Sequence, residues 1–444
     1  MRAVVLFTRD LRVHDNPALA AAVREADEVV PLFVRDPRIE RSFGAARRVS
    51  LLHEALADLR DALRGALAIR RGDPVRETLA LRPDAVYLSE DVSATAQRRE
   101  AALRDAVRVR TFLGITVVRP TALAPAGADH YRVFTPYHRA WLAEPRRALE
   151  PPPPRIPFPP GVEPGELPAA RRDPSFAAGG ETAARGRMRR WLDGALAAYD
   201  GDADRLDVDG TSRLSADLHL GCVSPLELAV EAQARGGHGF VRQLAWRDFY
   251  AQLLRARPET RDRDFRPRGD AWNDDPDGLA AWTEGRTGYP VVDAGMRQLA
   301  AEGWLPNRAR LITASFLVKH LYVDWREGAR VYEAQLLDGD VANNRGNWQW
   351  VAGTGVDTRP NRVYNPTLQA RRHDPTGDYV RRHVPELVGL PPEAIHEPWT
   401  LGEAALRRLG YPPPIVDHAA AVGRFRAARA ASGRDPGSGV RSRP

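Results

Sequence analysis

The stretch DGDVANNRGNWQW concentrates carboxylates, amides and indoles within a few residues. Asp338 and Asp340 flank a glycine, two asparagines follow, and Trp348 and Trp350 lie two positions apart. Indoles can stack on flat bases, and they can relay an electron because they are oxidised more easily than nearly any other side chain. The alternative is a turn that ends a helix, followed by tryptophans that fill a core.

A second polar cluster is DGTSRLS, in which Thr211, Ser212 and Ser215 place hydroxyls beside Arg213 at the approach to a predicted helix. Hydroxyls, backbone N–H groups and a guanidinium suit a phosphate group. The alternative is a helix N-cap, where Ser and Thr are preferred in any case.

Two further motifs are WTEGRTGYPVVDAGMRQL and NRARLITASFLVKHLYVDW, a turn that leads into a helix and a polar helix start. No Ser–His–Asp arrangement can be read from the sequence, and the histidines show no metal-ligand spacing. No Walker loop or G-x-G-x-x-G motif follows a strand. Any redox chemistry or photochemistry would therefore come from a bound cofactor.

The elements that position these motifs fall into two types. Up to about residue 120, buried-strand patterns alternate with helical patterns, which predicts a doubly wound parallel α/β domain of five strands. The predicted strands are AVVLF (3–7), VVPLFV (29–34), ALAIR (66–70), AVYLS (85–89) and ITVV (115–118). The helical patterns between them cover 47–65 and 97–108.

After about residue 175, amphipathic helical patterns replace the strands. They cover 182–199, 225–235, 238–256, 291–303, 309–325 and 329–339. The proline-rich residues 150–168 cannot form regular structure and indicate an extended crossing between domains. The predicted organisation is an α/β domain over 1–125, a linker over 126–174, a helical domain over 175–430 and a disordered tail over 431–444.

Composition limits the classes of protein and partner. The formal net charge of +7 favours a polyanionic partner such as nucleic acid, although a compositional bias without a partner is the alternative. No apolar run reaches the roughly 20 residues of a membrane span. The single cysteine, Cys222, excludes an internal disulfide, and no signal peptide is evident, so we expect a cytoplasmic protein.

Taken in order, the motifs resemble those of the photolyase/cryptochrome family, and within it the bacterial class I cyclobutane pyrimidine dimer photolyases. The resemblance covers nearly the whole chain, from FTRDLRVHDNPAL through DGTSRLSADLHLGCVSP, QLAWRDFY, WTEGRTGYPVVDAGMRQL and LITASFLVKHLYVDWREG to RVYNPTLQARRHDP. It implies an antenna-binding α/β domain, a linker and a helical domain that binds reduced, anionic FAD. The implied activity is light-driven splitting of dimers in single- or double-stranded UV-damaged DNA by a monomer, in the cytoplasm and on the nucleoid.

The resemblance also implies roles for residues of the cofactor site. Asn344 matches the residue opposite N5 of the flavin, where a neutral amide can accept a hydrogen bond. Asp338 is expected to pair with Arg310, since a buried Arg needs a carboxylate. The implied FAD-binding residues are Tyr199, Thr211, Ser212, Arg213, Leu214, Ser215, Arg310, Asp338, Asp340 and Asn344.

Tryptophans are implied in two further roles. Trp348, Trp325 and Trp272 match an electron-transfer chain that runs from the flavin to the surface. Trp246 and Trp350 match two aromatics that hold a dimer flipped out of the DNA stack. Arg247 and Arg308 are expected phosphate or lesion contacts, and the expected catalytic residues are Asn307, Gln243 and Asn344.

The sequence departs from the family pattern at two positions. Gln243 stands where many dimer photolyases have a glutamate, which resembles the (6-4) photolyases, and Leu311 replaces a common methionine. Against a (6-4) enzyme, this chain has Pro306–Asn307 where that branch needs adjacent histidines. Dimer repair is therefore the favoured function, and a (6-4) photolyase or a cryptochrome-type light sensor is the alternative.

For the antenna, the resemblance favours 8-hydroxy-5-deazaflavin, with methenyltetrahydrofolate as the alternative. Phe33, Arg48 and Asp91 match positions that line a deazaflavin site, although Arg48 could equally be a solvated helix residue.

Overall fold

The computed structural model describes residues 1–42, 46–169 and 176–432 of the chain. These residues form two compact units. Unit 1 comprises Met1–Ala203, Gly210–Arg261 and Glu333–Asn343, and unit 2 comprises Asp204–Asp209, Asp262–Tyr332 and Asn344–Pro444. The predicted boundaries at residues 125 and 174 stay a prediction.

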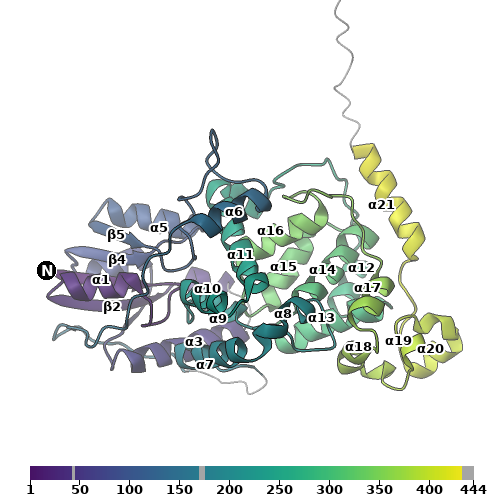
Figure 1. The fold of residues 1–444 in the computed structure, drawn as a ribbon, viewed down its shortest axis with the longest axis horizontal. Coiled ribbons are helices and arrows are strands. Elements are labelled where there is room, and N and C mark those ends of the chain that lie inside the picture. The colour runs from purple at the N-terminus through teal and green to yellow at the C-terminus, as the bar shows by residue number, and fades with distance from the viewer. Residues whose placement is uncertain (43–45, 170–175, 433–444) are drawn as a thin grey trace, which may run out of the picture. The chain divides into compact units, whose positions relative to one another are not determined.

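Unit 1 contains a parallel sheet of five strands in the order β3-β2-β1-β4-β5 (Figure 1). The strands are β1 (Arg2–Phe7), β2 (Glu28–Arg35), β3 (Ala68–Arg71), β4 (Ala85–Ser89) and β5 (Arg108–Phe112). The helices between them are α1 (Pro17–Glu25), α2 (Pro37–Ser42), α3 (Ala46–Ala62), α4 (Pro74–Ala80) and α5 (Ala94–Arg104). Consecutive strands with helical crossovers give the doubly wound fold that the sequence predicts, and this prediction is confirmed.

The fifth strand does not lie where the sequence predicts it. Residues 115–118 are buried but form no strand, and the edge strand is β5. The reason is a competing acceptor, because the backbone N–H groups of Val117 and Val118 donate to the carboxylate of Asp248 at 2.9 and 3.0 Å. With these donors satisfied by a side chain, the segment needs no neighbouring strand.

The predicted linker contains more structure than an extended crossing. It includes α6 (Phe134–Ala143), and its proline-rich part lies along the sheet. The carbonyls of Pro157 and Pro164 accept from the N–H groups of Val29 and Ile69 at 2.9 and 2.7 Å. Phe158 also packs against the core of the sheet. The proline-rich segment is therefore part of unit 1.

The remainder of unit 1 is helical. Its helices are α7 (Glu181–Asp193), η1 (Ala195–Ala198), α8 (Tyr199–Asp202), α9 (Ser215–Leu220), α10 (Pro225–Ala234), α11 (His238–Ala256) and η2 (Pro258–Arg261). Sequence signals account for α10, which starts at Pro225 after Ser224, whose hydroxyl accepts from the N–H of Glu227 at 3.2 Å.

The regular elements among the described residues of unit 2 are helices, joined by loops (Figure 1). They are α12 (Pro276–Thr283), α13 (Pro290–Glu302), α14 (Asn307–Ser315), the π-helix η3 (Phe316–Leu321), α15 (Trp325–Gln335), α16 (Val341–Ala352), α17 (Pro366–His373), α18 (Asp378–His383), η4 (Pro385–Leu387), α19 (Pro392–Ile395), η5 (Pro398–Leu401), α20 (Glu403–Leu409) and α21 (His418–Ser432). Two of these helices, α15 and α16, continue into residues of unit 1.

Two predictions for this region are wrong in part. The single helix expected over 309–325 is broken, because α14 gives way to η3 and Tyr322 then takes a left-handed conformation with φ of 54°. Residues 431 and 432 of the predicted tail belong to α21, and residues 433–444 lie outside the described residues. Within 1–42, 46–169 and 176–432, no helix combines the length and apolarity that crossing a membrane requires.

Candidate cofactor and substrate sites

In unit 1, the TSRLS segment contains buried hydroxyls that no described protein group satisfies. The Oγ1 atom of Thr211 and the Oγ atom of Ser215 are buried and have no hydrogen-bond partner among the described residues. The capping alternative is wrong, because the N-cap of α9 is Leu214 and no side chain caps it. Since buried polar groups nearly always have partners, these hydroxyls fit a segment that receives a polar ligand such as a phosphate.

The other members of this segment hold its backbone in place. Leu214 is fully buried, and its N–H donates to the hydroxyl of Ser212 at 3.3 Å. Arg213 is exposed and takes a left-handed conformation with φ of 52°. Tyr199 begins α8, with its ring edge-on to Trp191 and Phe240 at centroid distances of 5.9 and 5.5 Å.

Asp340, also in unit 1, is held as a carboxylate by an ion pair. Its Oδ2 atom lies 2.5 Å from Nη2 of Arg9, and its Oδ1 atom accepts from the N–H of Asn343 at 2.9 Å. Burial alone would raise the pKa of Asp340, but the charge of Arg9 and a contact with His219 hold it well below its usual value. The carboxylate therefore stays ionised and fixes the start of α16.

Asp338 lies on a loop that Arg48 of α3 positions. Arg48 is buried, and it donates to the carbonyl of Leu336 at 3.0 Å from Nε and to that of Glu333 from Nη2. A Cβ atom at Gly339, where φ is 42°, would lie 2.7 Å from Cζ of Arg48. The alternative of a solvated Arg48 is wrong. The reason is that its guanidinium donates hydrogen bonds to backbone carbonyls. The antenna role of Arg48 stays a prediction.

The other two antenna candidates lie near the carboxyl ends of the central strands of the sheet. Phe33 pairs in register with Phe7, the last residue of β1, and Asp91 follows the end of β4 at Ser89. Strands β2 and β4 flank β1, so these residues lie on either side of the point where the strand order reverses. Ligands of open α/β sheets bind outside the carboxyl ends of the strands at such a point.

Helix α11 carries Gln243, Trp246 and Arg247. Gln243 is exposed and Trp246 is partly exposed. One face of the indole of Trp246 is covered by Phe134 of α6, whose ring is 3.7 Å away and nearly parallel at 6°. Phe134 was not among the predicted site residues, because residue 134 falls within the predicted linker. A base that stacks on Trp246 would have to use its opposite face.

Arg247 points into unit 1. It donates to the carbonyls of Ile115 and Leu218 at 2.6 and 3.2 Å, and 13% of its side chain is exposed. Burial lowers its pKa, which Asp340 opposes. This guanidinium holds backbone, so a phosphate contact would compete with existing hydrogen bonds, and that contact stays a prediction.

In unit 2, Asn344 is buried on α16 with its amide orientation fixed. Its Nδ2 atom lies 3.0 Å from the carbonyl of Ala329, which can only accept. The amide nitrogen is thereby committed to the protein. The amide oxygen remains as the acceptor, as the predicted hydrogen bond from a flavin N–H requires.

The three tryptophans of the predicted electron-transfer chain differ in burial. Trp348 and Trp325 are buried, whereas Trp272 is partly exposed. The ring of Trp348 contacts Tyr332 and Trp282 edge-on, at 5.0 and 6.0 Å. These two neighbours were not predicted as site residues, although Trp282 opens one of the quoted motifs.

The two outer tryptophans have other partners. The indole N–H of Trp325 donates to the carboxylate of Asp264 at 2.8 Å. The ring of Trp272 lies 4.9 Å from that of Tyr322. Exposure increases from buried Trp348 to partly exposed Trp272, as expected of an electron-transfer chain that ends at the surface. The electron-transfer role of these tryptophans stays a prediction.

The start of α14 and the end of α16 carry the remaining candidates. Asn307 is exposed at the first position of α14, Arg308 forms an ion pair with Asp204, and Arg310 donates to the carbonyl of Leu305 at 3.1 Å. Trp350 is partly exposed, with the guanidinium of Arg362 5.6 Å from its ring. The pairs Arg310–Asp338 and Trp246–Trp350 span the two units and stay predictions.

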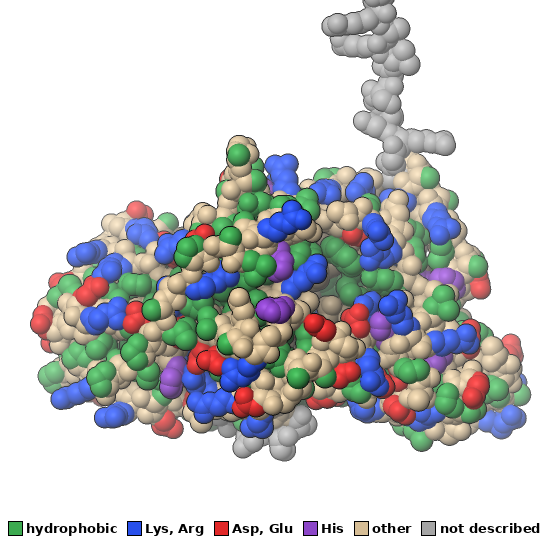
Figure 2. Space-filling view, viewed as in Figure 1, with side chains coloured by type: hydrophobic (Ala, Val, Ile, Leu, Met, Phe, Trp, Pro, Cys, Tyr) green, Lys and Arg blue, Asp and Glu red, His purple; other side chains and the backbone are tan. Residues whose placement is uncertain are grey.

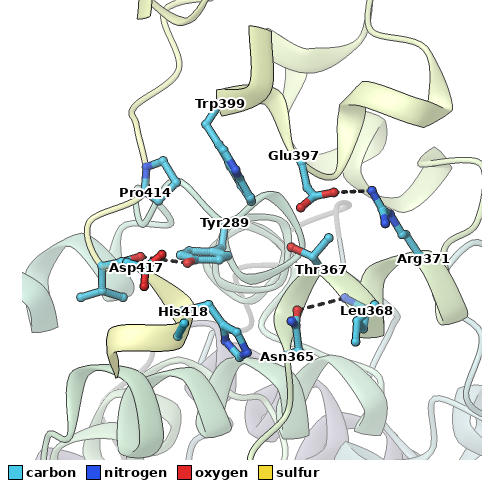
Figure 3. A pocket seen from close by; sticks show the side chains of 12 residues that line it. Tyr289, Asn365, Thr367, Leu368, Arg371, Glu397, Trp399, Pro414, Asp417 and His418 are labelled. Atoms are coloured by element: carbon cyan, nitrogen blue, oxygen red, sulfur yellow. Dashed lines mark hydrogen bonds and ion pairs between the residues drawn. The ribbon is translucent and has the colours of Figure 1, made fainter. Parts of the chain in front are cut away.

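Unit 2 also has a cavity of about 500 Å³ (Figure 3). Trp399 and Tyr289 face one another on one side, with ring centroids 5.3 Å apart, and an ion pair between Arg371 and Glu397 lies on another. None of the predicted site residues lines this cavity.

Comparisons with known proteins agree over nearly the whole chain. A family model described as DNA photolyase matches residues 3–157, and one described as the FAD binding domain of DNA photolyase matches residues 240–431. A Streptomyces griseus protein named deoxyribodipyrimidine photo-lyase is 49% identical over 96% of this chain and 99% of its own. An Escherichia coli K12 protein of the same name is 37% identical over 94% of this chain and 95% of its own.

Solved structures agree with the sequence relatives. A crystal structure of a bacterial class III photolyase from Agrobacterium tumefaciens superposes with a TM-score of 0.89 at 36% identity, over 98% of both chains. A Synechocystis cryptochrome superposes with a TM-score of 0.87 at 27% identity, over 96% of this chain and 99% of its own.

Proposed function

Because this chain belongs to the DNA photolyase family, we propose that it is a light-driven enzyme that repairs cyclobutane pyrimidine dimers in DNA with FAD as its cofactor. The observation that carries the proposal is the likeness, over nearly the entire length, to proteins named deoxyribodipyrimidine photo-lyase. When bound, reduced FAD supplies the light-driven electron that opens the cyclobutane ring.

The residues present fit such a cofactor. In unit 1 the unsatisfied hydroxyls of Thr211 and Ser215 would donate to phosphate oxygens. In unit 2 the amide of Asn344, fixed by Ala329, would present its oxygen to an N–H of the ring system. Trp348, Trp325 and Trp272 would restore the reduced state by passing electrons inward from the surface.

DNA contacts follow from the same assignment. Trp246 and Trp350 would stack on a flipped-out dimer, and Asn307 and Gln243, both exposed, would hydrogen-bond to its bases. Figure 2 shows Lys and Arg side chains spread over the face in view and interspersed with Asp and Glu. The excess of positive charge would support contacts to phosphates along the duplex. The protein would act as a monomer in the cytoplasm, on single- or double-stranded DNA of the nucleoid.

For the antenna we favour 8-hydroxy-5-deazaflavin over methenyltetrahydrofolate. The support is the position of Phe33 and Asp91 beside the carboxyl end of β1. An absorption spectrum of the protein purified with its native chromophores distinguishes the two, because their bands differ in position.

The function is tested with purified protein whose flavin is fully reduced, on DNA carrying one thymine dimer or one (6-4) product. We expect light-dependent loss of the dimer and no change in the dark. Loss of the (6-4) product alone would assign the enzyme to the branch that Gln243 resembles. Persistence of both lesions under light would favour a light sensor.

Replacing Trp350 by alanine is expected to weaken binding to dimer-containing DNA by about 1–3 kcal/mol, because stacking on the indole is lost. Affinity for undamaged DNA should hardly change, since phosphate contacts remain. The measurement is a pair of binding titrations at one salt concentration. Trp399→Ala, in the separate cavity of unit 2, is the matched control, and equal discrimination in both variants would remove Trp350 from the lesion site.

A further inference from the structure

One face of the Trp246 indole is covered by a ring from another helix of unit 1. Helices α6 and α11 lie side by side (Figure 1). The ring of Phe134, on α6, is nearly parallel to the indole on α11, with the centroids 3.7 Å apart and the planes at 6°. Phe134 is 6% exposed, whereas Trp246 is partly exposed. The exposed part of Trp246 therefore belongs to the surface that Phe134 leaves open.

Other rings limit the remaining movement of this indole. Phe249 contacts Trp246 edge-on at 5.5 Å and 86°, and Tyr250 lies 5.6 Å from it at 31°. Both of these residues are buried. Trp246 is thus held by three aromatic side chains of unit 1, and the Phe134 ring is the nearest and the most nearly parallel of them.

Phe134 is held in its turn. The imidazole of His138, one turn further along α6, stacks on the Phe134 ring at 5.3 Å and 17°. Further along the same helix, the indole N–H of Trp141 donates to Oδ2 of Asp248 at 2.9 Å, and Asp248 follows Trp246 by two residues on α11. Trp141 and Asp248 are 0% and 1% exposed. Moving the Phe134 ring away from the indole would therefore disturb a stack and a buried hydrogen bond.

This packing orders the indole before any ligand arrives. A side chain that becomes ordered only when its ligand binds lowers the affinity by the free energy of that ordering, whereas one that is already ordered does not. Close packing against a parallel ring restricts the indole to one rotamer. Trp246 is therefore ready to receive a flat group on its open face.

We propose that Phe134 is a positioning residue for lesion recognition, which holds the indole of Trp246 in the orientation that receives a base flipped out of DNA. Phe134 itself does not touch the base. The proposal rests on the proposed function, because that function assigns Trp246 to the lesion. It goes further by giving α6, a helix within the predicted linker, a part in the discrimination between damaged and intact DNA.

The first test compares two affinities of the full-length protein, loaded with FAD and kept in the dark. One is for a duplex with a single thymine dimer, the other is for the same duplex without it, and their ratio is the discrimination. Phe134→Leu keeps an apolar side chain but removes the flat ring. We expect it to lower the discrimination by roughly 2- to 10-fold, the effect of ordering one side chain. Affinity for the undamaged duplex should hardly change, since phosphate contacts remain.

A double-mutant cycle separates positioning from a direct contact with DNA. If Phe134 acts only through the indole, Phe134→Leu should cause no further loss of discrimination in a protein that already carries Trp246→Ala. A further loss of the full size in the double variant would overturn the proposal. Unchanged discrimination in Phe134→Leu alone would overturn it as well.

Tyr137→Leu is the matched control, because it also removes a buried ring from α6. Tyr137 is 2% exposed, and its ring packs against Tyr131 and Phe249 at 5.8 and 5.2 Å. This variant should discriminate like the wild type, and a circular dichroism melt checks that each variant is folded. Equal losses in Tyr137→Leu and Phe134→Leu would mean that any damage to α6 weakens recognition, which contradicts a specific role for Phe134.

A second readout needs no DNA. In protein labelled with fluorotryptophan, the ¹⁹F resonance that disappears in Trp246→Phe belongs to Trp246. We expect relaxation dispersion to detect exchange of this resonance between orientations in Phe134→Leu, but not in the wild type or in Tyr137→Leu. A single orientation in Phe134→Leu would overturn the proposal. A wild type that does not prefer the dimer would contradict the proposed function instead, and the resonance would still show whether Phe134 holds the indole.

Discussion

Replacing Asp248 by alanine is expected to destabilise unit 1 by about 3–5 kcal/mol, because it leaves several buried donors without a partner. The Oδ2 atom of Asp248 accepts from the backbone N–H groups of Val117 and Val118 and from the indole N–H of Trp141, at 2.9, 3.0 and 2.9 Å. Asp248 is 1% exposed, so water cannot replace these bonds. It joins α11, α6 and the segment after β5.

Asparagine at position 248 is the matched control. Its amide oxygen can accept the same three hydrogen bonds, so Asp248→Asn should cost no more than about 1 kcal/mol. Denaturant unfolding of both variants at one pH measures the difference. Equal destabilisation by Ala and Asn would show that the carboxylate charge, and not its oxygen as an acceptor, is what the fold needs.

The same pair of proteins tests a pH dependence. Burial, with Oδ1 of Asp248 lacking a hydrogen bond, raises the pKa of this carboxyl from 3.8 to about 6. The folded protein therefore binds the proton more tightly than the unfolded chain. The stabilisation from the Asp248 carboxyl is fully present below its pKa in the unfolded chain, 3.8. It falls by about 3 kcal/mol as the pH rises from there toward 6.

Subtracting the unfolding free energy of Asp248→Asn from that of the wild type isolates the contribution of the Asp248 carboxyl. Asp374, whose pKa burial also raises to about 6, is present in both proteins and cancels. We expect the difference in unfolding free energy between the two proteins to change across this range and to be constant above it. A difference independent of pH would mean that Asp248 ionises at its ordinary pKa.

The sheet was predictable because its strands are short apolar runs separated by helical patterns, and these patterns are local. The strand predicted over residues 115–118 is absent for a non-local reason, since Asp248 lies far along the chain and replaces the strand partners of Val117 and Val118. The break after α14 was equally invisible, because the apolar periodicity continues through η3 to Tyr322. Tertiary hydrogen bonds decided both cases.

The candidate site followed a similar pattern. The motifs identified the segments with chemistry, but they could not indicate which neighbours complete each side chain. Phe134, the residue stacked on Trp246, lies in FTPYHRAWLA, where Phe134, Tyr137 and Trp141 share one buried helical face. That spacing could have identified α6 within the predicted linker. No sequence pattern predicts the hydrogen bonds from Arg48 to the carbonyl of Leu336 and from Asn344 to that of Ala329.

Replacing Gly328 by alanine is expected to destabilise unit 2 by about 1–3 kcal/mol, because no space exists for one methyl group. A Cβ atom there would lie 2.1 Å from Cη2 of Trp348 and 2.6 Å from Cδ2 of Leu317. Trp348 cannot easily move away, since it is 2% exposed and packs against Tyr332 and Trp282. The overlap should exceed the roughly 1 kcal/mol that alanine gains over glycine within a helix.

Gly423→Ala provides the matched control for that change. Gly423 is also helical, in α21, but nothing lies within 4 Å of a Cβ atom added there. This variant should be neutral or more stable by up to about 1 kcal/mol. Denaturant titrations followed by tryptophan fluorescence measure both changes. If Gly328→Ala were as stable as Gly423→Ala, Trp348 would have room to shift, and the close packing of α15 against it would not be what sets the position of this tryptophan.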